Sequence, residues 1–333
     1  MSGRPWAILS TLAVVLVVSA AVVLGQTAAK MMSERSDEKV TRPKSTGASS
    51  ANNRTVCYGE STFKGDLLDA LKKPPQLVVL GGSRAQRFEP NYIRRLTGLS
   101  AFNFALQNSR PEGAYAISKY LFSRAPDVKL RCFYALEATT FGDRPMHPGL
   151  LYDERFSQWF PPDLVSRQKE LNGPPKRVSF PSKRYSPRGL LLHNEYDEML
   201  ARGRKQEQTL RVYIADLLPR AAASGATQTR SRHYFEKLLK LYNDHGVTPA
   251  IVIMPYHPLV LEAFRKVGWQ AKNDALLAYL RELQQTYDLH ILDYTEIESF
   301  GGDPRFFYDG AHVMKGNARL ILEQAVKDAP ECF

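Results

Sequence analysis

Residues 76–85 read QLVVLGGSRA, an apolar run that stops at two glycines and delivers one serine. Consecutive β-branched and leucine residues are typical of a strand buried on both faces, as in a parallel sheet covered by helices. Ser83 would then lie where the strand ends, at the edge of the sheet where open α/β folds bind ligands. Two interpretations of Ser83 remain open at this point: a nucleophile, or the N-cap of a helix that begins near Gln86.

Strand-like and helix-like patterns alternate through much of the remaining chain. Further strand-like runs occur at residues 101–105, 130–136, 247–255 and 290–293. Helical patterns occur at residues 91–96, 111–124, 232–245, 259–266, 273–287 and 314–326. This alternation predicts an α/β fold in which helices cover both faces of a parallel sheet of about five strands.

The N-terminal part has a different composition. Residues 6–25 are apolar and uncharged, and about 20 residues at 1.5 Å each match the roughly 30 Å core of a bilayer. We therefore expect a single-pass transmembrane anchor, with cleavage as a signal peptide as the alternative, and with the bulk of the chain extracytoplasmic. Residues 26–54 are polar and predict a disordered linker, and the folded domain is expected at 55–330.

Residues 142–225 interrupt the alternation. The segment is rich in proline, and between residues 161 and 232 fourteen Lys or Arg stand against seven Asp or Glu. An insertion this long predicts a lid or a substrate-selecting subdomain, because single loops of this length are uncommon in compact domains. A solvated decoration without a role in catalysis is the alternative.

The net charge and the cysteine content indicate which classes of partner and metal site to expect. The net charge of +11, from 45 basic and 34 acidic side chains, favours acidic polymers, anionic lipid or a negatively charged cell envelope. No nucleic-acid-binding motif accompanies this charge, so no nucleic-acid partner is expected. The three cysteines form no C-x-x-C pair, which argues against a zinc site or a redox dithiol, although Cys57 and Cys332 can pair if the chain is exported.

A second motif supplies what Ser83 lacks. Asp309-Gly310-Ala311-His312 is the one Asp-x-x-His among seven histidines, and it precedes the last helical pattern. A serine hydroxyl is a weak nucleophile that needs a neutral imidazole to take its proton, and a carboxylate to hold that imidazole in the right tautomer. The sequence thus predicts Ser83, His312 and Asp309 as catalytic residues, with a chance occurrence of Asp-x-x-His as the alternative.

These two blocks resemble the first and last sequence blocks of the SGNH (GDSL-like) hydrolase superfamily. The likeness is greatest to its membrane-anchored or exported cell-envelope members, such as alginate acetyl-transfer proteins and the D-alanyl-transfer protein of teichoic acid synthesis. The resemblance implies a three-layer flavodoxin-like fold and ester chemistry without a metal. It also implies a serine esterase or O-acyltransferase that acts on an acylated envelope glycan or a small acyl ester, beside envelope-assembly proteins.

The oxyanion hole of that family is made by the serine N–H, a glycine after the second strand and an asparagine after the third. Here Asn108 stands near the expected glycine, and its backbone N–H can still serve. The third block, LEATT at residues 136–140, contains no asparagine, so Thr139 and Thr140 are the candidate donors. The loss of one donor typically costs roughly 10²–10³ in rate. A catalytically weak module that binds envelope polymer through its basic insertion is therefore the alternative function.

Two further side chains are candidates for substrate binding. Arg84 follows the serine and can bind an anionic group, with ordinary ion pairing as the alternative. His257 follows the fourth strand at the same sheet edge, with a structural hydrogen bond as the alternative. No cofactor is expected, because the glycines before Ser83 lack the G-x-G-x-x-G spacing of a dinucleotide site.

Overall fold

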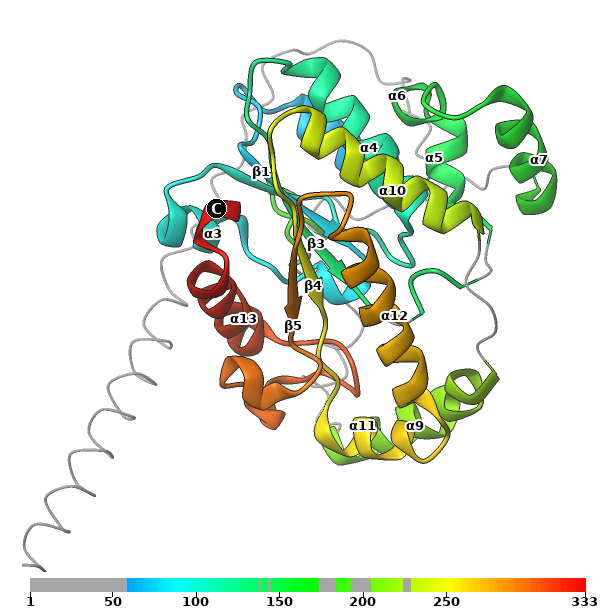
Figure 1. The fold of residues 1–333 in the computed structure, drawn as a ribbon, viewed down its shortest axis with the longest axis vertical. Helices are drawn as coiled ribbons and strands as arrows, with labels where there is room; N and C mark the ends of the chain where they lie inside the picture. Colours follow the sequence, from blue (N-terminus) through cyan, green and yellow to red (C-terminus); the bar gives the residue numbers. More distant parts are fainter. Residues whose placement is uncertain (1–58, 138, 143–144, 174–183, 193–204, 224–228) are drawn as a thin grey trace, which may run out of the picture. The chain divides into compact units, whose positions relative to one another are not determined.

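A parallel sheet forms the centre of the fold. The computed structural model describes residues 59–137, 139–142, 145–173, 184–192, 205–223 and 229–333, and within them five strands form one sheet. They are β1 (Leu77–Gly81), β2 (Ala101–Asn103), β3 (Arg131–Leu136), β4 (Ala250–Ile253) and β5 (His290–Asp293). The predicted α/β architecture with a five-stranded parallel sheet is confirmed (Figure 1).

The strand order is β2-β1-β3-β4-β5. The chain therefore builds the sheet outward from β1 in both directions, and the order reverses between β1 and β3. In doubly wound sheets of this order, ligands bind at the carboxyl edge of the strands where the reversal opens a crevice. The fold thus points to the ends of β1 and β3 before any side chain is considered.

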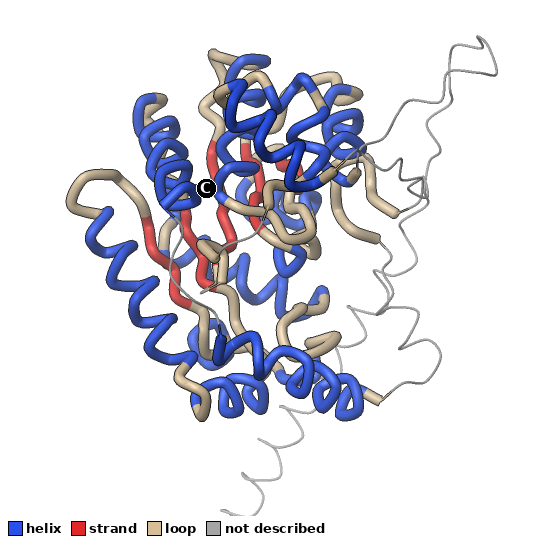
Figure 2. Tube along the Cα trace, turned by 90° about the vertical axis from the view of Figure 1, so that its right-hand side faces the viewer, coloured by secondary structure: helices blue, strands red, loops and turns tan. Residues whose placement is uncertain are grey.

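Helices cover both faces of the sheet (Figures 1 and 2). One face packs on α2 (Glu60–Asp69), α4 (Pro111–Arg124), α10 (Thr229–Asp244) and α12 (Trp269–Leu283). The other face packs on α3 (Pro90–Thr97) and α13 (Lys315–Asp328). Alternate residues of β1 serve the two layers, since Val78 and Leu80 face the first and Leu77 and Val79 the second. This explains the continuous apolar run in the sequence.

The predicted insertion contains helices where it is described. These are α5 (Pro148–Tyr152), α6 (Glu154–Ser157), α7 (Pro162–Asn172) and α9 (Gln206–Ala223). Helix α5 contacts α2, α6 contacts α4 and α7 contacts α5, whereas α9 packs against α11 (Pro258–Arg265). Short 3₁₀ turns complete the described elements: η1 (Ser83–Ala85), η2 (Ile297–Phe300), η3 (Pro304–Phe306) and η4 (Pro330–Cys332). The expectation that the insertion is a lid stays a prediction.

Helix α2 was not predicted from the sequence. Its buried positions include Glu60, Ser61, Thr62 and Lys64, so the face that it turns to the protein is largely polar. Without an apolar stripe, a sequence pattern gives little sign of a packed helix.

The predicted anchor at 6–25, the linker at 26–54 and Cys57 lie outside the described residues. Within the described part, every helix is too short or too polar to cross a membrane. Cys132 and Cys332 are buried free thiols.

Candidate active site

Ser83 stands at the carboxyl end of β1, on the turn that leaves the sheet. Gly81 has φ 136°, and a Cβ there would lie 2.7 Å from the carbonyl oxygen of Ala135 on β3. Glycine is therefore required for the close approach of β1 and β3 just before the serine. The helix predicted near Gln86 begins instead at Pro90, with Glu89 as its N-cap, so the N-cap interpretation of Ser83 is wrong.

The structure brings Ser83 and His312 together from opposite ends of the domain. Ser83 Oγ lies 2.8 Å from His312 Nε2, and His312 Nδ1 lies 2.8 Å from Asp309 Oδ2. An ionised carboxylate only accepts hydrogen bonds, so Asp309 selects the tautomer in which Nδ1 carries the proton. Nε2 is then free of a proton and can accept the hydroxyl hydrogen of Ser83.

Asp309 is held as an anion. It is 1% exposed, and its Oδ1 accepts the backbone N–H groups of Ala311 and His312, each across 2.8 Å. Burial alone would raise the pKa of Asp309, but the facing imidazole and these two N–H groups outweigh it and hold the pKa below its ordinary value. The carboxylate is thus charged at any pH at which the His312 imidazole is neutral and can act as a base.

The loop that carries this pair is fixed by its neighbours. Phe307 and Val313 form an antiparallel bridge across it, and the Gly310 carbonyl accepts the His257 N–H across 2.9 Å. A Cβ on Gly310 would collide with the ring of Tyr213 on α9 and with Val260 on α11. Gly310 therefore allows these two helices to close directly onto the loop.

His257 serves the loop rather than the pocket. Its side chain is buried, and its Nδ1 accepts the Leu259 N–H across 3.2 Å, which caps α11. Burial lowers the pKa of His257, so the neutral form that can accept this hydrogen bond is favoured. The predicted substrate contact of His257 finds no support in this arrangement, whereas the structural alternative does.

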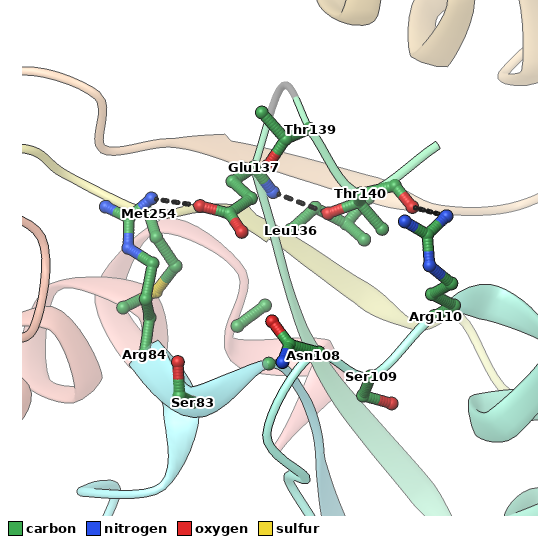
Figure 3. A pocket seen from close by; sticks show the side chains of 12 residues that line it. Ser83, Arg84, Asn108, Ser109, Arg110, Leu136, Glu137, Thr139, Thr140 and Met254 are labelled. Atoms are coloured by element: carbon green, nitrogen blue, oxygen red, sulfur yellow. Dashed lines mark hydrogen bonds and ion pairs between the residues drawn. The ribbon is translucent and has the colours of Figure 1, made fainter. Parts of the chain in front are cut away.

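A pocket of about 40 Å³ opens beside Ser83 (Figure 3). It lies between the ends of β1 and β3, where the strand order reverses, and its lining includes Asn108, Thr139 and Thr140. All four oxyanion candidates from the sequence therefore line one pocket. Since a cavity needs roughly 10–15 Å³ for one water, this space suits a group of a few heavy atoms.

Asn108, which the sequence places near the glycine expected from the resemblance, has an unusual backbone conformation. Its φ of 55° is left-handed, a conformation that asparagine tolerates better than most residues. The backbone thus adopts here the kind of conformation that favours glycine, although the side chain differs. Across the pocket, Thr140 Oγ1 accepts the Glu137 N–H across 3.0 Å, and the Thr139 side chain is hydrogen-bonded to the Glu137 carboxylate.

Arg84 is committed to protein acceptors. Its side chain is 6% exposed, and Nη1 lies 2.9 Å from Glu137 Oε2. Nε donates to the carbonyl of Ala311 across 3.2 Å, Nη2 donates to the carbonyl of Pro255, and the guanidinium stacks over the ring of Tyr256 at 4.1 Å. This is the ion-pairing alternative, and the predicted contact of Arg84 with an anionic substrate gains no support.

Sequence reasoning did not single out Glu137, which directly follows β3 and lines the pocket. Burial would raise its pKa, but the charge and hydrogen bond of Arg84 outweigh burial and lower it. The carboxylate therefore stays ionised beside Ser83, where negative charge would oppose an oxyanion, and the Arg84 guanidinium compensates it. The sequence contained one sign of this role, because an acidic residue directly after a buried strand indicates a polar site at the edge of the sheet.

No model of a known protein family matches the chain, and a comparison with curated proteins finds no significant match. Across the described residues, no cluster of His, Cys, Asp and Glu side chains could hold a metal ion.

Proposed function

We propose that this protein is a serine esterase or O-acyltransferase that works through an acyl-serine intermediate. The observation that carries the proposal is the chain of two 2.8 Å contacts from Ser83 through His312 to Asp309. This order supplies the nucleophile, base and orienting carboxylate that acyl transfer requires, and Ser83 lines a pocket.

In the first half-reaction, His312 Nε2 takes the hydroxyl proton as Ser83 Oγ forms a bond to the ester carbonyl carbon. The carbonyl π electrons move onto its oxygen, and Asp309 stabilises the imidazolium that results. The tetrahedral species then collapses, the bond to the alkoxy oxygen breaks, and His312 gives its proton to that leaving oxygen. Ser83 is left as an ester of the acyl group.

In the second half-reaction, water or an acceptor hydroxyl attacks the acyl-serine. His312 takes the proton of the attacking oxygen and returns a proton to Ser83 Oγ as the acyl bond to serine breaks. Water yields a carboxylic acid, whereas a sugar hydroxyl yields a new ester. The same residues therefore support hydrolysis and transfer, and the acceptor decides between them.

The N–H groups of Ser83 and Asn108 are the proposed donors to the oxyanion. The hydroxyl of Thr140 is the third, because the Thr139 hydroxyl already donates to the Glu137 carboxylate. This assignment is supported by the shared pocket. The pocket of about 40 Å³ has room for a short acyl group. The apolar stretch at 6–25 and the charge of +11 support a membrane-anchored, extracytoplasmic enzyme that acts on an acylated envelope glycan.

One observation favours a second function, a catalytically weak module that binds envelope polymer. Glu137 stands at the third strand end, where the resembled family has an oxyanion donor, and it brings a carboxylate to the pocket. If the Arg84 guanidinium does not compensate this charge in the transition state, acyl transfer is slow.

Labelling with a fluorophosphonate separates the two functions. The full-length protein in detergent is incubated with the probe, and the modified residue is identified by mass spectrometry. We expect stoichiometric labelling of Ser83 in the wild type and in Ser123→Ala, an exposed serine on α4, and none in Ser83→Ala. Absence of labelling in the wild type, under conditions that label a control esterase, would favour the binding module.

A further inference from the structure

Two charged side chains of α2 are buried against the candidate site. Glu60 is 4% exposed and Lys64 is 0% exposed. Charged side chains are almost never buried this completely unless partners satisfy them. We call these two residues the α2 clamp, because their backbone partners lie within residues 103–107, just before Asn108 in the pocket lining.

Glu60 joins three segments. Its Oε2 accepts the backbone N–H of Gln107 across 2.7 Å, and its Oε1 accepts from Gln86 Nε2 and from the Tyr185 hydroxyl. Gln107 immediately precedes Asn108, and Gln86 immediately follows the turn that begins at Ser83. One carboxylate therefore holds both the loop after β1 and the loop after β2.

Lys64 holds the same loop at two further points. Its Nζ donates to the carbonyl oxygens of Asn103 and Ala105, across 3.2 Å and 2.6 Å, and lies 4.7 Å from the centre of the Tyr185 ring. Burial lowers its pKa to about 8, although the charge of Glu60 opposes this. Residues 103–107 are thus fixed from α2 at three backbone groups.

The backbone conformation of Asn108 indicates why this loop needs to be fixed. Its φ of 55° is unfavourable for a residue with a Cβ, and such conformations persist where the surroundings over-determine them. The clamp holds the N–H of Gln107 and so fixes the Leu106–Gln107 peptide, which immediately precedes the peptide that carries the Asn108 N–H. Donors to an oxyanion are effective when they are held in place before the charge develops.

We propose that Glu60 and Lys64 are positioning residues, which fix the loop at 103–108 so that the Asn108 N–H and Ser83 face the same pocket. This inference rests on the proposed acyl-transfer function. The clamp touches no reacting atom and acts through the loop. A helix that precedes β1 in the chain thereby completes the site.

Three variants of α2 test the proposal in the full-length protein. Glu60→Ala removes the acceptor of the Gln107 N–H. Glu60→Gln keeps one carbonyl oxygen for that N–H, while the Gln86 amide and the Tyr185 hydroxyl can turn to accept from the new NH₂ group. Asp69→Asn changes an exposed carboxylate on the same helix and is the matched control.

The first measurement is steady-state hydrolysis of p-nitrophenyl acetate at a temperature where circular dichroism shows each variant folded. For Glu60→Ala we expect kcat to fall about a hundredfold, as for a misplaced oxyanion donor, with KM changed less than about threefold. Glu60→Gln should lie within about fivefold of the wild type, and Asp69→Asn should match it. Unchanged kcat in folded Glu60→Ala, or equal losses in both Glu60 variants, would overturn the proposal.

The second measurement is independent of activity. Amide hydrogen exchange, followed by mass spectrometry, should be at least tenfold faster over residues 103–108 in Glu60→Ala and unchanged over α4. Equal exchange in the wild type and Glu60→Ala would show that the clamp does not fix the loop, and would overturn the inference even if the enzyme is active. A wild type that neither hydrolyses the ester nor labels with the fluorophosphonate removes the proposed function and, with it, the positioning role.

Discussion

The Arg84 guanidinium donates from Nε to the carbonyl oxygen of Ala311 across 3.2 Å. The residue after the candidate nucleophile thus holds the residue before the candidate base. The same side chain reaches Glu137 after β3 and Pro255 after β4, so one cation joins the loops that form the site. The 2.8 Å contact between Ser83 and His312 depends on how these loops are held.

Replacing Arg84 with lysine should therefore lower catalysis rather than substrate binding. Lysine ends in a single nitrogen, so it cannot reach Ala311, Glu137 and Pro255 from the three separate positions of arginine Nε, Nη1 and Nη2. We expect kcat of Arg84→Lys to fall by about tenfold or more, with a smaller change in KM, in ester hydrolysis assays. Arg124→Lys, at an exposed ion pair on α4, is the control. A wild-type kcat in folded Arg84→Lys would contradict this role.

The two glycines before Ser83 should differ in their tolerance of alanine. Gly81→Ala places a Cβ 2.7 Å from a backbone oxygen of β3 at φ 136°, whereas a Cβ on Gly82 meets no heavy atom within 4 Å. We expect Gly81→Ala to lose about 2 kcal/mol or more of unfolding free energy and Gly82→Ala less than about 1 kcal/mol. Urea unfolding of both variants measures the difference, and equal losses would refute it.

Asn108 offers a test of which of its groups serves the site. If the donor is the backbone N–H, Asn108→Gly should keep kcat within about threefold, because glycine has the same N–H and accepts left-handed φ. Asn108→Ala should lose about 1 kcal/mol of stability through strain. Kinetics and thermal unfolding of both variants check these outcomes. A large loss of kcat in Asn108→Gly would instead assign the role to the side-chain amide.

Asp309→Asn should remove most of the activity without unfolding the protein. The amide cannot enforce the tautomer in which Nδ1 carries the proton, and the loss expected for a triad aspartate is about 10⁴ in kcat. Circular dichroism shows whether the variant is folded, and single-turnover acylation measures the chemical step. Retention of more than about a tenth of wild-type kcat would mean that His312 acts without Asp309.

The depressed pKa of Asp309 also predicts a pH dependence of stability. A carboxylate whose folded pKa is lowered contributes stability that is present above its unfolded pKa, near 4, and is lost as pH falls through the folded value. The difference in unfolding free energy between the wild type and Asp309→Asn should therefore shrink below about pH 4. Urea unfolding from pH 3 to pH 6 measures it, and a constant difference would contradict the shift.

Lys64 should also make stability depend on pH, but in the alkaline range. Its folded pKa is lowered to about 8 from 10.5, so the unfolded chain holds more protons between these values. Stability from this group should rise with pH over that window, by at most about 1.4 kcal/mol per pH unit. The difference between the wild type and Lys64→Met isolates it, because the other groups cancel. Lys240→Met is the exposed control, and a flat difference from pH 8 to pH 10 would refute the shift.

Local patterns were sufficient for much of the fold. The helix predicted at 111–124 has the bounds of α4, because proline suits a first turn and an amphipathic face follows it. The apolar run before Gly81 became β1, since a strand buried on both faces has no polar positions to interrupt it. The pairing of Asp309 with His312 could also be predicted from the sequence, because the two residues are only three positions apart on one loop.

Helix α2 was missed for a physical reason. Glu60 and Lys64 read as solvent-exposed charges in a sequence, and only their partners in distant loops explain why they are buried. Arg84 and Glu137 present the same difficulty, since each charge is satisfied by groups from other strand ends. The sequence shows which charged residues are present, but it does not show which of them contact one another in the fold.

The amino-acid sequence thus specified the alternation that builds a parallel sheet, a glycine-serine turn at its edge and an Asp-x-x-His loop near its end. These features depend on short-range sterics and on apolar periodicity, which are written in neighbouring residues. The tertiary structure decided between a helix cap and a partner of His312 for Ser83. Those two residues are 229 positions apart, and they meet because all strands of the parallel sheet end at the same edge, where Arg84 and the His257 N–H hold the loop that carries His312.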